Sequence, residues 1–128
     1  MSLDVATPHS VLDLSAAMSN MDGDVELLRE IVDIFLETSQ DQITVLRNAI
    51  RSGDVQTVAI DAHGMKGGAS NFCAGAFVES ALALEMLAKS GDLTGAEELL
   101  ARMEEHLEEL RAVMSVVNWD EVARNWDG

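Results

Sequence analysis

Aromatic residues, proline and cysteine are all scarce in this sequence. Phenylalanine and tryptophan make up 4% of the 128 residues, and tyrosine is absent. The single proline, Pro8, lies near the start, away from every segment expected to be helical. The single cysteine, Cys73, cannot form an internal disulfide, and no secretory signal is recognisable, so we expect a cytoplasmic protein. Because alanine, leucine, methionine and glutamate are abundant, the composition predicts an all-α fold.

Positive charge is also scarce. The chain has 8 basic and 23 acidic residues, which gives a formal net charge of -15. Such a chain is repelled by nucleic acid phosphates and by anionic membranes, so we expect neither as a partner. No apolar stretch approaches the roughly 20 residues that span a bilayer. The length and the 48% hydrophobic content predict one domain with one core, and we expect a monomer.

Glycine and aspartate mark the ends of four predicted long helices. The breaks lie at 22–24, 52–54, 74–76 and 90–92, and the tight turn at 52–54 predicts antiparallel neighbours. Between the breaks, apolar residues recur at spacings of three and four, which is typical of amphipathic helices. The expected core positions are Leu28, Val32, Phe35, Ser39, Ile43, Leu46, Ile50, Val55, Val58, Ala62, Met65, Ala69, Phe72, Phe77, Ala81, Leu84, Ala88, Ala96, Leu100, Met103, Leu107, Leu110, Met114 and Val117.

The two ends of the chain are less regular. Thr94 and Glu97 have the spacing of a capping box, which predicts that the last long helix begins near them. The apolar segment 11–18 predicts a short extra helix across one end of the bundle. The tripeptide Asn-Trp-Asp occurs at 118–120 and 125–127, so the tail either docks its tryptophans or binds another molecule. We therefore divide the chain into a flexible N-terminus (1–10), a helical bundle (11–118) and a C-terminal tail (119–128).

The helix predicted over 55–72 has an unusual outer face. Long charged side chains are expected opposite the core, but the residues near His63 are small or apolar. The outward positions are Ala59, Ile60, Gly64, Gly67 and Ser70. Gly68 is a third glycine in this helix. Each glycine within a helix costs on the order of 1 kcal/mol of stability relative to alanine. Close packing between helices explains at most Gly68, so we infer that a partner protein approaches the bare backbone, with Ala59 and Ile60 as apolar contacts.

His63 and Lys66 lie one turn apart on this face. A neutral imidazole is a good nucleophile toward an acyl phosphate, and an ammonium group one turn away could stabilise phosphoryl oxygens. A glycine at 67 leaves room for the transferring group. An ordinary surface histidine is the alternative, which the surrounding glycines make less attractive.

The run from Ala62 to Phe72 resembles the phosphorylation motif of histidine-containing phosphotransfer (HPt) domains, in which His, an apolar residue, Lys and Gly occur as H-x-[LIM]-K-G followed by small residues. The helix order over about 14–114 is also similar. The resemblance implies an up-and-down antiparallel four-helix bundle, with the short extra N-terminal helix in addition. It also implies a phosphoryl group on Nε2 of His63, supported by Lys66 and accommodated by Gly67.

The resemblance also bears on Glu85 and Cys73. In the related domains of chemotaxis kinases a glutamate on the following helix orients the histidine through Nδ1, and the same offset implies Glu85 here. A plain surface carboxylate is an equally good interpretation of Glu85, since helix surfaces are rich in glutamate. Most family members carry glycine where this chain has Cys73, from which we expect a modest shift of the helix end.

The resemblance implies a phosphorelay intermediate that exchanges a phosphoryl group with receiver-domain aspartates, with a response regulator or a hybrid histidine kinase as partner. The chain has no glycine-rich nucleotide loop and no carboxylate cluster for Mg²⁺, so we expect neither autonomous kinase nor phosphatase activity. The receiver would supply Mg²⁺. His9 and His106 lack the Glu-x-x-His spacing of bundle metal sites, so no metal or other cofactor is expected. The alternatives are an adaptor that docks on a receiver or kinase without being phosphorylated, and a purely structural bundle.

Overall fold

The turn between the first two long helices follows from three residues. In the computed structural model, which describes residues 11–126, α2 (Val25–Ser52) ends at Gly53, whose φ of 75° is the left-handed conformation that glycine adopts readily. The next residue, Asp54, caps α3 (Val55–Ser70) by accepting a hydrogen bond from the amide of Thr57 at 3.1 Å. The predicted antiparallel turn is confirmed. The predicted flexible segment 1–10, with His9, lies outside the described residues.

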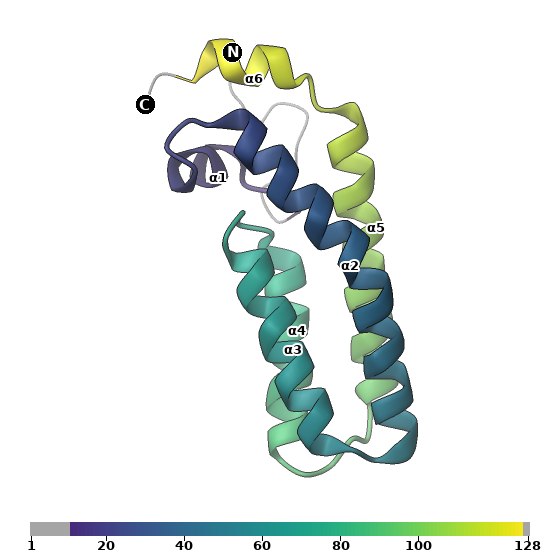
Figure 1. Cartoon of the computed structure of the whole chain (residues 1–128). Helices are drawn as coiled ribbons and strands as arrows, with labels where there is room; N and C mark the ends of the chain where they lie inside the picture. Colours follow the sequence, from purple (N-terminus) through teal and green to yellow (C-terminus); the bar gives the residue numbers. More distant parts are fainter. Residues whose placement is uncertain (1–10, 127–128) are drawn as a thin grey trace.

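Four long helices form a closed ring. α3 packs on α2, α4 (Gly75–Lys89) packs on α3, and α5 (Ala96–Val116) packs on both α4 and α2 (Figure 1). This is the predicted up-and-down antiparallel four-helix bundle, and α1 (Leu14–Asn20) is the predicted short extra helix beside the start of α2. None of the helices within 11–126 combines the length and apolar character needed to cross a membrane.

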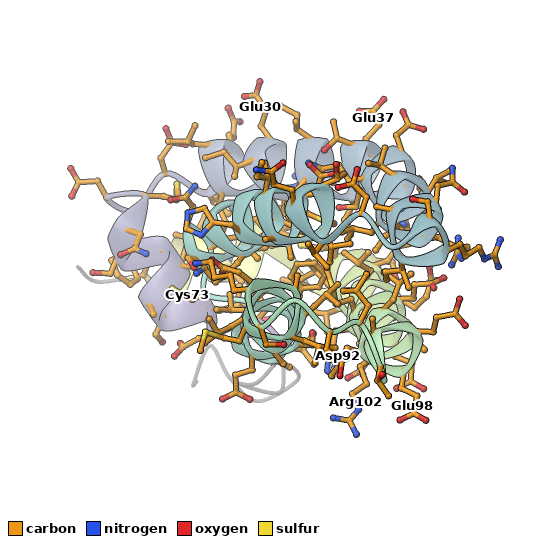
Figure 2. All side chains as sticks on the ribbon, turned by 90° about the horizontal axis from the view of Figure 1, so that it is seen from below. Glu30, Glu37, Cys73, Asp92, Glu98 and Arg102 are labelled. Atoms are coloured by element: carbon orange, nitrogen blue, oxygen red, sulfur yellow. The ribbon has the colours of Figure 1, made fainter. Side chains whose placement is uncertain are left out.

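The core lies inside this ring. Figure 2 shows hydrocarbon filling the space between the helices, while the labelled side chains of Glu30, Glu37 and Glu98 point outward. The buried polar residues Ser39 and Ser80 each donate a hydroxyl hydrogen bond to a carbonyl of the preceding turn, so neither hydroxyl is left unpaired. Nearly every predicted core position is buried. The partly buried exceptions are Ile50, Val55, Met114 and Val117.

The predicted capping box at the start of α5 is wrong. The cap position is Gly95, with a φ of 87° and no side-chain cap. The hydroxyl of Thr94 donates instead to the carboxylate of Asp92, at 2.7 Å, and the Thr94 amide bonds to the same oxygen at 2.9 Å. Because Asp92 takes both groups of Thr94, the threonine cannot cap the helix two residues later.

The predicted tail contains a further helix, α6 (Trp119–Asn125), which lies across the end of the bundle (Figure 1). Asn118 caps it by accepting from the amide of Glu121 at 3.0 Å. Val122 is buried, and both tryptophans of the tail pack against the core. The domain boundary at 118 remains a prediction.

Cys73 lies in the connection between α3 and α4 and has a left-handed backbone conformation. α3 ends at Ser70, two residues earlier than predicted, and Cys73 has a φ of 60°. Its carbonyl accepts a hydrogen bond from the amide of Asp13 at 3.2 Å, which ties the connection to the segment before α1. A side chain with a Cβ is strained in the left-handed region, which explains why glycine suits this position.

We expect Cys73→Gly to raise the free energy of unfolding by roughly 1 kcal/mol, because it removes the Cβ from a left-handed residue. Cys73→Ala is the matched control, since it removes the thiol and keeps the Cβ. Urea denaturation followed by circular dichroism measures both variants. Equal stabilities of the Gly and Ala variants would show that the left-handed conformation is not strained.

Candidate functional site

The outer face of α3 is as bare as its sequence predicts. The side chain of His63 is 66% exposed. Apart from its own stretch of α3, a Cβ built on Gly64 or on Gly67 would meet no atom within 4 Å, so packing against other elements requires neither glycine. Ala59 is partly buried, and 66% of Ile60 is exposed. The imidazole therefore stands beside open helix backbone.

Gly68, in contrast, is required by packing between α2 and α3. A Cβ at this position would lie 3.3 Å from the ring of Phe35, so the glycine admits an aromatic ring from α2. That ring packs edge to face on Phe72 and Phe77, with centroids 5.1 and 5.4 Å apart. All three phenylalanines of the chain thus form one cluster beneath the C-terminal half of α3.

Glu85 on α4 lies directly beneath this face, and its side chain is only 2% exposed. Its Oε2 is 2.9 Å from Nδ1 of His63 and 2.9 Å from Nζ of Lys89. Its Oε1 accepts a hydrogen bond from Nζ of Lys66 at 2.7 Å. One carboxylate therefore joins an imidazole and two ammonium groups from two helices.

These contacts determine which nitrogen of His63 is free. The hydrogen bonds from Lys66, Lys89 and then His63 lower the pKa of Glu85 to about 2, against the effect of burial. Glu85 is therefore ionised at neutral pH and can only accept hydrogen bonds. Nδ1 must then carry the hydrogen that it shares with Glu85. In the neutral imidazole this leaves the lone pair on Nε2, the nitrogen that does not face the carboxylate.

The structure brings together His63, Lys66 and Glu85, as the sequence motif and the family offset imply. The alternative that Glu85 is an ordinary surface carboxylate is wrong, because the side chain is buried and faces α3. Lys66 does not extend freely into solvent, since its ammonium group is bound to Glu85 and its side chain is 22% exposed. Ser70 is exposed, and its hydroxyl donates to the carbonyl of Lys66 at 2.8 Å.

Two features of this region were missed by the sequence analysis. Lys89 follows Glu85 by four residues, a spacing that favours an ion pair on a helix and could have indicated the contact. A groove of about 260 Å³ lies between α2 and α3 next to Gly64, and Ile34, which is 52% exposed, is among the residues that line it. The groove is lined by Ile31, Ile34, Phe35, Thr38, Gln42, Gly64, Met65, Gly68, Asn71 and Phe72.

Other reactive side chains do not form a comparable site. Within residues 11–126, no cluster of three or more histidine, cysteine or acidic side chains could hold a metal ion. Nδ1 of His106 lies 3.3 Å from a carboxylate oxygen of Glu109, one turn away on the same helix. Burial and the charge of Asp13 raise the pKa of the Cys73 thiol, which makes it less reactive.

Comparison with known proteins agrees with this geometry. The family model described as the Hpt domain matches residues 30–113. The chain belongs to the Hpt family. The crystal structure of histidine-containing phosphotransfer protein B (HptB) from Pseudomonas aeruginosa PAO1 is similar to this Hpt domain, with a TM-score of 0.76 and 28% identity over 94% of this chain and 99% of that one. No sequence among curated proteins matches the chain significantly.

Histidine phosphotransfer in a phosphorelay is therefore the function of this Hpt domain. Hpt domains interact with receiver domains and kinases in such relays.

The ionised state of Glu85 predicts a pH dependence of stability. Its pKa in the folded chain, about 2, lies below the ordinary value of 4.5, so its charge stabilises the fold above about pH 4.5, and this contribution is lost as the pH falls toward 2. Glu85→Gln removes the titration. We expect the wild type to be more stable than Glu85→Gln near pH 6, with a difference that shrinks between pH 4.5 and 2. Denaturant unfolding at a series of pH values measures it, and a difference independent of pH contradicts the assignment.

Proposed function

We propose that this Hpt domain accepts a phosphoryl group on Nε2 of His63 from the aspartyl phosphate of a receiver domain and passes it to another receiver aspartate. The observation that carries the proposal is the contact between Nδ1 of His63 and the buried, ionised Glu85 at 2.9 Å. This contact leaves Nε2 as the nucleophile on an exposed and unobstructed face. Lys66 is the cation placed to stabilise phosphoryl oxygens, as its position one turn away suggests.

The transfer needs only groups that the two proteins supply. The lone pair of Nε2 attacks phosphorus, the Nε2–P bond forms as the P–O bond to the aspartate breaks, and the aspartate leaves as a carboxylate. Nδ1 keeps its proton and donates a hydrogen bond to Glu85, whose negative charge stabilises the positive charge that develops on the ring. The reverse sequence on a second receiver returns the ring to its neutral state.

The docking surface that we propose is centred on His63. Ala59, Ile60, Gly64, Gly67 and Ser70 form its α3 side, and the groove beside Gly64 and Gly68 continues it onto α2. The exposed side chains of Ile60 on α3 and Ile34 on α2 provide apolar contacts for this surface. Such a surface suits a transient contact of small area.

We propose a receiver domain, free or as part of a hybrid histidine kinase, as the partner, and a monomeric, cytoplasmic form of the chain. The single cysteine fits a reducing compartment. The adaptor alternative would use the same surface. It does not account for a buried carboxylate that orients an exposed imidazole, since docking alone requires no particular tautomer.

The first test is chemical labelling. We expect a phosphorylated receiver with Mg²⁺ to transfer radioactive phosphate to the wild type, giving an acid-labile and alkali-stable label on His63. His63→Gln is expected to remove the label completely, while His106→Gln on the distant α5 retains it. If a panel of cognate receivers never labels the wild type, the relay function is excluded, and binding that survives His63→Ala would then identify an adaptor.

The second test concerns Gly67. Gly67→Leu is expected to raise the helicity or stability slightly, because leucine is about 1 kcal/mol better than glycine in a helix and a Cβ meets no neighbour here. It is also expected to slow phosphotransfer severely, because the side chain occupies the space of the transferring group. Gln56→Leu is the matched control, since Gln56 is exposed on α3 two turns before His63. A folding defect in Gly67→Leu would show that the glycine is structural.

A further inference from the structure

The ammonium group that the motif assigns to the phosphoryl group is already engaged. Nζ of Lys66 donates to Oε1 of Glu85 at 2.7 Å, and only 22% of the side chain is exposed. An ammonium group bound to a carboxylate at this distance has much of its charge compensated. A phosphoryl group that arrives on His63 must therefore compete with Glu85 for Lys66.

Lys89 meets the same carboxylate from the other side. Its Nζ is 2.9 Å from Oε2 of Glu85, the oxygen that also faces Nδ1 of His63. With His63 neutral, two ammonium groups against one carboxylate leave the cluster with one net positive charge, in a chain whose formal charge is -15. Without Lys89, Lys66 and Glu85 would neutralise one another, and no net positive charge would face the incoming group.

We propose that Lys89 is a positioning residue for phosphotransfer: it holds the Glu85 carboxylate against Nδ1 of His63 and compensates its charge when Lys66 turns toward the phosphoryl group. This inference rests on the proposed function of His63 and adds a residue to it. Lys89 acts through Glu85 and does not itself need to touch the phosphoryl group. Its side chain is 60% exposed, so it can be replaced without opening the core.

The test uses phosphoramidate, a donor too small to depend on receiver docking. In its zwitterionic form its P–N bond breaks as the Nε2–P bond forms, and ammonia leaves. Lys89→Met is expected to slow labelling of His63 by about 3- to 5-fold, the effect of losing one partly exposed ion pair, and Lys89→Arg to restore it. Arg102→Met is the matched control. It removes the same charge from an exposed position on α5, and Figure 2 shows Arg102 pointing away from the bundle.

A double-mutant cycle separates the two ways in which Lys89 could act. If it acts through Glu85, Lys89→Met has no further effect in a Glu85→Gln background. The same fold-change in both backgrounds would overturn the proposal in favour of a direct contact with phosphate. Equal slowing by Lys89→Met and Arg102→Met would overturn it in favour of a general effect of net charge.

The ¹⁵N chemical shifts of the His63 ring provide a readout without any transfer. We expect the wild type to give one protonated nitrogen, Nδ1, and one unprotonated nitrogen, Nε2. Lys89→Met is expected to move the two shifts toward each other, because a less restrained carboxylate selects the tautomer less strongly. Unchanged shifts together with unchanged labelling would refute the positioning role. Failure of every receiver to label the wild type would remove the relay function, while the phosphoramidate and ¹⁵N comparisons would still decide the role of Lys89.

Discussion

A buried carboxylate joins α3 to α4 at the level of His63, and the chemistry of the site depends on it. Within the described part of the chain, Glu85 is the only charged side chain in the core. Removing an ionised carboxylate from water is costly unless its oxygens are paired, and here one imidazole and two ammonium groups pair them. The same contacts select the imidazole tautomer. The same hydrogen bonds of Glu85 therefore affect both the stability of the fold and the proposed reactivity of His63.

The phenylalanine cluster and the bare face of α3 are two sides of the same arrangement. Gly68 lets Phe35 approach from α2, whereas Gly64 and Gly67 face solvent and satisfy no packing requirement. Three glycines in a short stretch of helix thus divide into one that serves the core and two that serve the surface. The helix is kept in place by tertiary packing, which offsets its low intrinsic helix propensity.

Which residues share one face of a helix could be predicted from the sequence, whereas contacts between helices could not. The spacing of His63 and Lys66 places them on one face whatever the rest of the chain does. Glu85 depends on the register of α4 against α3, so it was reached only through the family offset. Ile34 depends on the register of α2, and no local pattern distinguishes it from other exposed apolar residues. The capping box failed for a local reason, because Asp92 competes for the hydroxyl of Thr94.

The exposure of His63 limits how this protein can discriminate between partners. The side chain of His63 is 66% exposed on α3, so the part of the chain that the structure describes leaves the imidazole largely open to solvent. Under the proposed function, a phosphoryl group on Nε2 would be accessible to water and to a partner protein from the same open side. Discrimination between partners then depends on how well a whole partner surface fits around the imidazole. The site itself makes too few contacts around the reacting group to exclude other molecules.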